Sequence, residues 1–148
     1  MTLEAVLAAL HLLAILTLVV FLSSQAALCR PEWLNAAGVK RLARLDLIYG
    51  IVAGILLLTG IARVVWGAKG LAWYLSQPML HLKVTLFVLA ALLSIVPSLQ
   101  FRKWLKALND HGALPDVPTV RRTRRWIMWQ SHLIPVIAVI AVFWARGW

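Results

Sequence analysis

The chain has 148 residues, of which 62% are hydrophobic and 14% are charged. A water-soluble domain is excluded as the starting class, because about a quarter of the residues in such domains are charged. The formal net charge is +10, and the single cysteine, Cys29, excludes an intrachain disulfide and a CxxC metal or redox motif.

Four apolar segments are each long enough to cross a bilayer as a helix. In chain order they cover about 3–28, 45–66, 79–99 and 126–144. We therefore expect an all-α fold, namely an integral membrane four-helix bundle. Residues 1–148 would form a single transmembrane domain, with loops at 29–44 and 100–125. The N-terminus has no basic region of the kind that begins a signal peptide, so we expect the first segment to be retained.

Basic residues are concentrated in the two predicted loops, which hold eleven of them. The opposite side of the membrane would hold three, namely Arg63, Lys69 and Arg146. Because basic loops stay on the cytoplasmic side, both termini are predicted to be non-cytoplasmic. This topology explains the positive charge, so we expect the lipid bilayer as a partner and no nucleic acid.

Ionisable side chains inside a bilayer are costly, so each one is a candidate for function. On the second segment Asp46 shares a face with Gly50 and Gly54, and this GxxxG spacing predicts a close helix contact in the bundle interior. Asp46 and Arg63 either bound a polar channel, bind the acid groups of a cofactor, or simply mark the two ends of the helix.

On the third segment His81 and Lys83 are two residues apart, so they point about 200° apart around the helix. Lys83 shares its face with small residues and is predicted to point inward, unless it snorkels to the interface, whereas His81 points sideways. Because the first and third segments start on the same side, His11, His81, Lys83 and Arg63 are predicted to lie at similar depth. His132, near the other side, would share a secondary polar cluster with Asp46 and Tyr49.

Helical bundles bind cofactors through side chains on facing helices. An imidazole and a second nitrogen donor held across such a bundle suit haem iron, and they also suit copper. Hydrolytic and nucleotide chemistry have no support, because GxSxG, HExxH, P-loop and glycine-rich dinucleotide motifs are all missing from the sequence.

Two resemblances add to this reading. The stretches 45–70, PMLHLK (78–83), LLSIVPS (92–98) and ARG (145–147) resemble an uncharacterised family of small four-span bacterial membrane proteins. More distantly, ALHLL with His11, the Tyr49-Gly50 pair and HLK with Lys83 are similar to HemJ-type protoporphyrinogen oxidases and to CopD-like membrane proteins. The HemJ likeness implies bound haem b and essential, catalytic roles for His11 and Lys83.

The first hypothesis is therefore a haem b protein of the bacterial cytoplasmic membrane that transfers electrons or acts as a haem-dependent oxidoreductase. His11 would be an iron ligand with His81 or Lys83 opposite, Arg63 and Lys69 would lie near the propionates, and a redox protein or a quinone would be the partner. The second hypothesis is a cofactor-free protein that binds or permeates a small solute or a copper ion along Asp46, His132, Lys83 and His11. The third is a structural partner subunit, including a homo-oligomer, that packs through the glycine face of the second segment.

Overall fold

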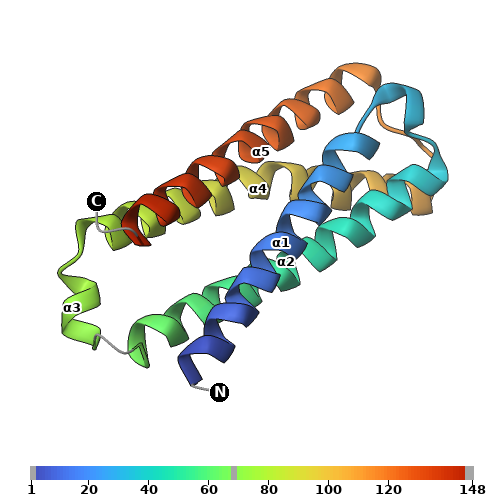
Figure 1. The fold of residues 1–148 in the computed structure, drawn as a ribbon. Helices are drawn as coiled ribbons and strands as arrows, with labels where there is room; N and C mark the ends of the chain where they lie inside the picture. The colour runs from blue at the N-terminus through green and yellow to red at the C-terminus, as the bar shows by residue number, and fades with distance from the viewer. Residues whose placement is uncertain (1–2, 68–69, 146–148) are drawn as a thin grey trace.

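The computed structural model describes residues 3–67 and 70–145, and within them it contains helices and no strand. The elements in chain order are α1 (Leu3–Leu28), the 3₁₀ helix η1 (Pro31–Trp33), α2 (Ala36–Val65), α3 (Leu71–Leu75), α4 (Pro78–His111) and α5 (Val117–Ala145) (Figure 1). Among the described residues, four helices, α1, α2, α4 and α5, are long and apolar enough to cross a membrane. The prediction of an all-α membrane bundle is confirmed.

The helices are longer than the apolar segments that predicted them. Helix α2 begins at Ala36 rather than near 45, α4 continues to His111 rather than ending near 99, and α5 begins at Val117 rather than near 126. The predicted loops 29–44 and 100–125 are therefore mostly helical, which corrects the expected boundaries. Hydropathy marks only the part of a helix that lies in hydrocarbon, whereas Lys, Arg, Leu and Ala outside it are good helix formers.

Local capping, not hydropathy, sets where these helices begin and end. The Asn35 side chain accepts a hydrogen bond from the Gly38 N–H at 2.8 Å and so caps α2. Gly112, with a φ of 64°, adopts the left-handed conformation that ends α4. Asp116 accepts from the Thr119 N–H at 3.2 Å at the start of α5, and hydrogen bonds with Thr119 lower the pKa of the Asp116 carboxyl. Of the two predicted loops, only two short connections therefore remain. They are residues 29–35 around η1 and residues 112–116.

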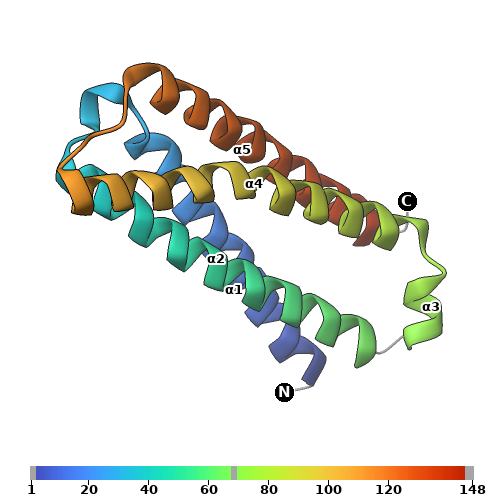
Figure 2. The ribbon, with the colours of Figure 1, turned by 180° about the vertical axis from the view of Figure 1, so that it is seen from behind.

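The long helices form two antiparallel pairs, α1 with α2 and α4 with α5. We call the end that carries η1 and residues 112–116 the basic end, and the opposite end the α3 end. The two pairs lie close together at the basic end and diverge toward α3, as both views show (Figures 1 and 2). Helix α1 begins and helix α5 ends at the α3 end.

The most completely buried side chains lie near the basic end. Val39, Leu42, Phe101 and Ile127 are all 0% exposed, and they come from α2, α4 and α5. Cys29 is buried beside them, with its thiol 3.9 Å from the Val120 carbonyl, and burial raises the pKa of this thiol to about 12. The two helix pairs are therefore joined mainly by apolar packing at this end.

The predicted glycine contact of the second segment is wrong within this chain. Gly50 and Gly54 are exposed, and a Cβ added at either would meet nothing within 4 Å. The interior face of α2 instead passes through Tyr49, Val52 and Leu56, which are buried at steps of three and four residues. The pair of glycines lies to one side of that face and is directed away from the other helices.

Gly38 and Gly54 make a matched pair for testing the helix packing. A Cβ at Gly38 would lie 2.9 Å from the Trp33 carbonyl oxygen, so Gly38→Ala must shift the backbone of η1, whereas the site of Gly54→Ala is open. We expect Gly38→Ala to lower the free energy of unfolding by about 1–3 kcal/mol, in the range of overpacked sites. Thermal unfolding in detergent measures this, and equal destabilisation by Gly54→Ala would contradict the packing described here.

Candidate functional site

His11 is held against helix α2 by one hydrogen bond and one close packing contact. Its Nδ1 lies 2.9 Å from the Thr59 hydroxyl oxygen. A Cβ at Gly60 would lie 3.3 Å from the Cε1 of His11, so the lack of a side chain at Gly60 leaves room for the imidazole ring. The ring is half-buried between α1 and α2 at the α3 end of the bundle.

The hydrogen bonds of Thr59 favour one tautomer of His11. The Thr59 hydroxyl lies 2.9 Å from the Ile55 carbonyl and 3.0 Å from the Leu56 carbonyl of its own helix, so it donates there. Its oxygen then accepts from His11 Nδ1–H. In a neutral imidazole with the proton on Nδ1, Nε2 has a lone pair free for a ligand or a metal. A hydrogen-bonded second nitrogen is the usual arrangement of a metal-binding histidine.

Two cationic side chains lie within electrostatic range of His11. They are Arg63, one helical turn beyond Thr59 on α2, and Lys83, half-buried on α4. Arg63 and Lys83 also interact electrostatically with each other. The structure thus brings together three of the four residues that the sequence placed at one depth, and we call His11, Thr59, Arg63 and Lys83 the His11 cluster.

His81 takes no part in this cluster. It is exposed, and its Nε2 donates a hydrogen bond of 2.8 Å to the carbonyl oxygen of Leu75 at the end of α3. The histidine therefore ties the short helix α3 to the first turn of α4. Lys69, predicted to lie near haem propionates, falls outside the described residues.

A second polar cluster lies in the bundle interior nearer the basic end. The Ser98 hydroxyl donates to Oδ1 of Asp46 at 2.6 Å, which joins α4 to α2. The Gln130 side-chain amide donates to the Tyr49 hydroxyl at 2.5 Å and to the Ala90 carbonyl at 3.3 Å, which joins α5 to α2 and α4. Gln25 of α1 lies beside Asp46, is 2% exposed, and has no hydrogen-bond partner for its Nε2 among the described residues.

The predicted third member of this cluster, His132, lies elsewhere. Its side chain is exposed, and its Nδ1 donates to the Met128 carbonyl of its own helix at 2.6 Å. Gln130 occupies the interior position instead, because two residues along a helix turn the side chain by about 200°. Sequence reasoning missed Gln25, Ser98 and Gln130, although amide and hydroxyl groups within apolar segments were a signal that could have found them.

Metal ligands do not gather elsewhere in the part of the chain that the structure describes. Residues 3–67 and 70–143 contain no group of three or more His, Cys, Asp or Glu side chains placed to hold one ion. Any metal bound among these residues would depend on a single side chain such as His11 or on a cofactor that supplies the remaining ligands.

The fold and the two polar clusters define a small four-span helical membrane protein. The model of the family described as "Predicted membrane protein (DUF2214)" matches residues 3–148. The chain therefore belongs to this family, in agreement with the predicted resemblance to a family of small membrane proteins. Neither a curated protein nor a solved structure matches the chain.

The Tyr49–Gln130 hydrogen bond can be tested by a double-mutant cycle. Tyr49→Phe and Gln130→Leu each leave a buried polar group with fewer partners, and each is expected to cost about 1–3 kcal/mol. The double variant removes both the Tyr49 hydroxyl and the Gln130 amide, so neither is left buried without the other. Its cost should therefore be smaller than the sum of the two single costs. Unfolding in detergent measures the three free energies, and strictly additive costs would show that the two side chains do not interact.

Proposed function

We propose that this protein binds haem b near the α3 end and transfers electrons or oxidises a substrate there, with His11 Nε2 as an iron ligand. The observation that carries the proposal is the hydrogen bond from His11 to Thr59, which leaves Nε2 with its lone pair. Neutral imidazole is a common axial ligand of haem iron, and helical bundles often hold such groups between facing helices.

The neighbours of His11 also suit such a group. Haem carries two carboxylates, and Arg63 and Lys83 are the cations in range of His11 that would bind them. The helix pairs α1–α2 and α4–α5 diverge toward this end (Figure 2), and we propose that they move apart further to admit the cofactor. The residues thus fit the group.

Each residue of the cluster has a separate role in this proposal. Bound haem would supply one-electron chemistry. Thr59 orients the imidazole and fixes its tautomer, Gly60 leaves room for the ring, and Arg63 and Lys83 bind and orient acidic groups. The apolar side chains around them limit the access of water. The HemJ likeness gives Lys83 an essential role, and in the alternative to carboxylate binding a neutral Lys83 amine would be the second nitrogen donor to the iron.

We further propose that the protein lies in the cytoplasmic membrane of a bacterium with both termini outside. The excess of basic residues at the basic end supports this orientation. The His11 cluster would then lie in the outer half of the bilayer, where an electron would be exchanged with a quinone or with a redox protein.

A second candidate function rests on the buried cluster of Gln25, Asp46 and Ser98. The Gln25 amide nitrogen is a donor without a full hydrogen bond, which favours a water molecule that accepts from it, and the neighbouring Asp46 carboxyl would attract a proton or a small cation. In this candidate the protein carries no cofactor, and a small solute crosses the bundle between the two polar clusters.

The absorbance of the purified protein separates the two candidates. Protein prepared in detergent from haem-replete cells should give a b-type reduced-minus-oxidised spectrum and about one haem per chain in a pyridine haemochrome assay. His11→Ala should abolish the spectrum, because it removes the ligand, whereas His132→Ala should leave it intact because that ring is exposed and bonded to its own helix. A colourless wild-type protein would contradict the haem proposal.

Thr59→Val tests the positioning role of the hydroxyl. Loss of a group that orients a metal-binding histidine typically weakens binding about 10–100-fold. We therefore expect Thr59→Val to retain the b-type spectrum with lower haem occupancy and a shifted reduction potential, as measured by potentiometric titration. An unchanged potential and occupancy would show that Thr59 does not act on the ligand.

If the protein proves colourless, the second candidate is tested in liposomes. Asp46→Asn preserves the shape of the side chain but removes its charge, so proton or cation flux should fall. Flux that is the same with wild type, with Asp46→Asn and with protein-free liposomes would exclude this candidate as well.

A further inference from the structure

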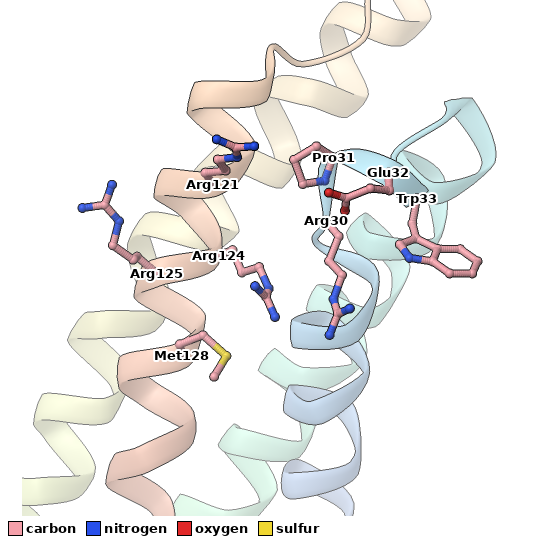
Figure 3. A pocket seen from close by; sticks show the side chains of 8 residues that line it. All are labelled: Arg30, Pro31, Glu32, Trp33, Arg121, Arg124, Arg125 and Met128. Carbon is pink, nitrogen blue, oxygen red and sulfur yellow. The ribbon is translucent and has the colours of Figure 1, made fainter.

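A pocket of about 530 Å³ opens at the basic end, between the segment that follows α1 and the first turns of α5 (Figure 3). Four arginines line it: Arg30 from the segment that follows α1, and Arg121, Arg124 and Arg125 from α5. The one acidic residue of the lining is Glu32. This pocket is distant in the fold from the His11 cluster, so its function does not depend on the haem proposal.

Three of the arginines are arranged around the opening. In Figure 3 the guanidinium groups of Arg30 and Arg124 point into the space between the two segments, Arg121 is directed toward η1, and Arg125 is turned away. Arg124 is half-buried, and its Nε donates to the Ala26 carbonyl at the end of α1 across 3.5 Å. This bond holds Arg124 in the floor of the pocket.

The charge of the lining identifies the kind of ligand. The lining holds four arginines and one glutamate, so a bound anion would relieve the repulsion between the arginines that face the opening. Guanidinium groups are planar, always charged, and able to donate two parallel hydrogen bonds to a phosphate. The chemistry of the pocket therefore suits a phosphate group.

The position of the pocket relative to the bilayer indicates where that phosphate comes from. The apolar part of α5 follows directly after Arg125, and Met128 forms the apolar side of the pocket. Trp33 of the lining and Trp129, the residue after Met128, are 63% and 69% exposed. Exposed tryptophans of this kind lie at the level of the lipid headgroups.

A second, smaller groove follows the contact between α1 and α5 away from the basic end. It has a volume of about 50 Å³ and is lined by Val19, Leu22 and Ser23 of α1 and by Ser131, Ile134 and Pro135 of α5. The lining is mostly apolar and lies deeper in the membrane than the arginines. An acyl chain that descends from a headgroup in the arginine pocket would reach this groove between the same two helices.

From these two features together we propose that the protein binds an anionic phospholipid at the basic end. Its phosphate lies among Arg30, Arg121 and Arg124, and one acyl chain packs over the surface of α1 and α5, where the small groove takes a few of its methylene groups. Basic pockets between membrane helices are known to bind such headgroups. The lipid would join α1 to α5 at the end where the two helix pairs pack together.

Native mass spectrometry of the delipidated full-length protein in detergent tests the proposal. Phosphatidylglycerol should bind at least about tenfold more tightly than phosphatidylcholine with the same acyl chains. Arg30→Gln combined with Arg121→Gln should weaken phosphatidylglycerol binding about 25-fold, since each arginine near a charged lipid surface contributes about a factor of five. Arg44→Gln combined with Arg122→Gln is the matched control, because both residues are exposed and outside the pocket, and the loss of charge is equal.

Glu32→Gln should change the affinity for phosphatidylglycerol in the opposite direction. Because the expected result is tighter binding, misfolding of the variant could not imitate it. Removal of the one carboxylate of the pocket should tighten phosphatidylglycerol binding several-fold and leave phosphatidylcholine unaffected. Equal weakening by the pocket and control pairs would show that diffuse surface charge attracts the lipid, and would overturn the proposal. Displacement of phosphatidylglycerol by millimolar inorganic phosphate would also overturn it, because the site would then belong to a soluble anion.

Discussion

The cost of an unpaired polar group in hydrocarbon is the constraint on which the rest of this structure depends. Helical segments satisfy most of their backbone hydrogen bonds internally, so the arrangement of the bundle is decided mainly by side chains. The buried polar contacts, Asp46 with Ser98 and Tyr49 with Gln130, join α2 to α4 and α5. They are directional, unlike apolar packing, and they therefore favour one rotation of these helices about their axes. The Gln25 amide nitrogen is the exception among the described residues, because it lies beside Asp46 without a hydrogen bond of full geometry.

The molecule is divided along the membrane normal into two halves of different character. Near the basic end the helix pairs are joined by a closely packed core that includes Phe101 and Ile127. Toward α3 the pairs diverge, and the His11 cluster lies in this less packed half (Figure 1). The two proposals follow this division, because the proposed haem ligand lies in the half where the pairs diverge. The proposed phosphate site lies among the four arginines of the basic end.

The predictions from sequence succeeded for the membrane helices and for the common depth of His11, Arg63 and Lys83, and they failed for helix ends and for the direction in which some side chains point. Apolar length alone predicted all four membrane helices, but their ends are set by Asn35, Gly112 and Asp116, which lie outside the apolar runs. The inward direction of the glycine pair on α2 was wrong, because periodicity shows which residues share a face and not what that face contacts. For the same reason His132 was assigned a place that Gln130 occupies.

By itself the sequence determined the class of protein, the number of membrane helices and the concentration of positive charge at one end. These three properties follow from local composition and from the free energy of transfer into lipid. The tertiary structure alone decided which polar side chains meet. Thr59 meets His11 across 48 positions of the chain, and Arg124 meets the end of α1 across 98. Such contacts depend on the rotation and crossing of whole helices, which many apolar side chains determine together, and no local pattern contains that information.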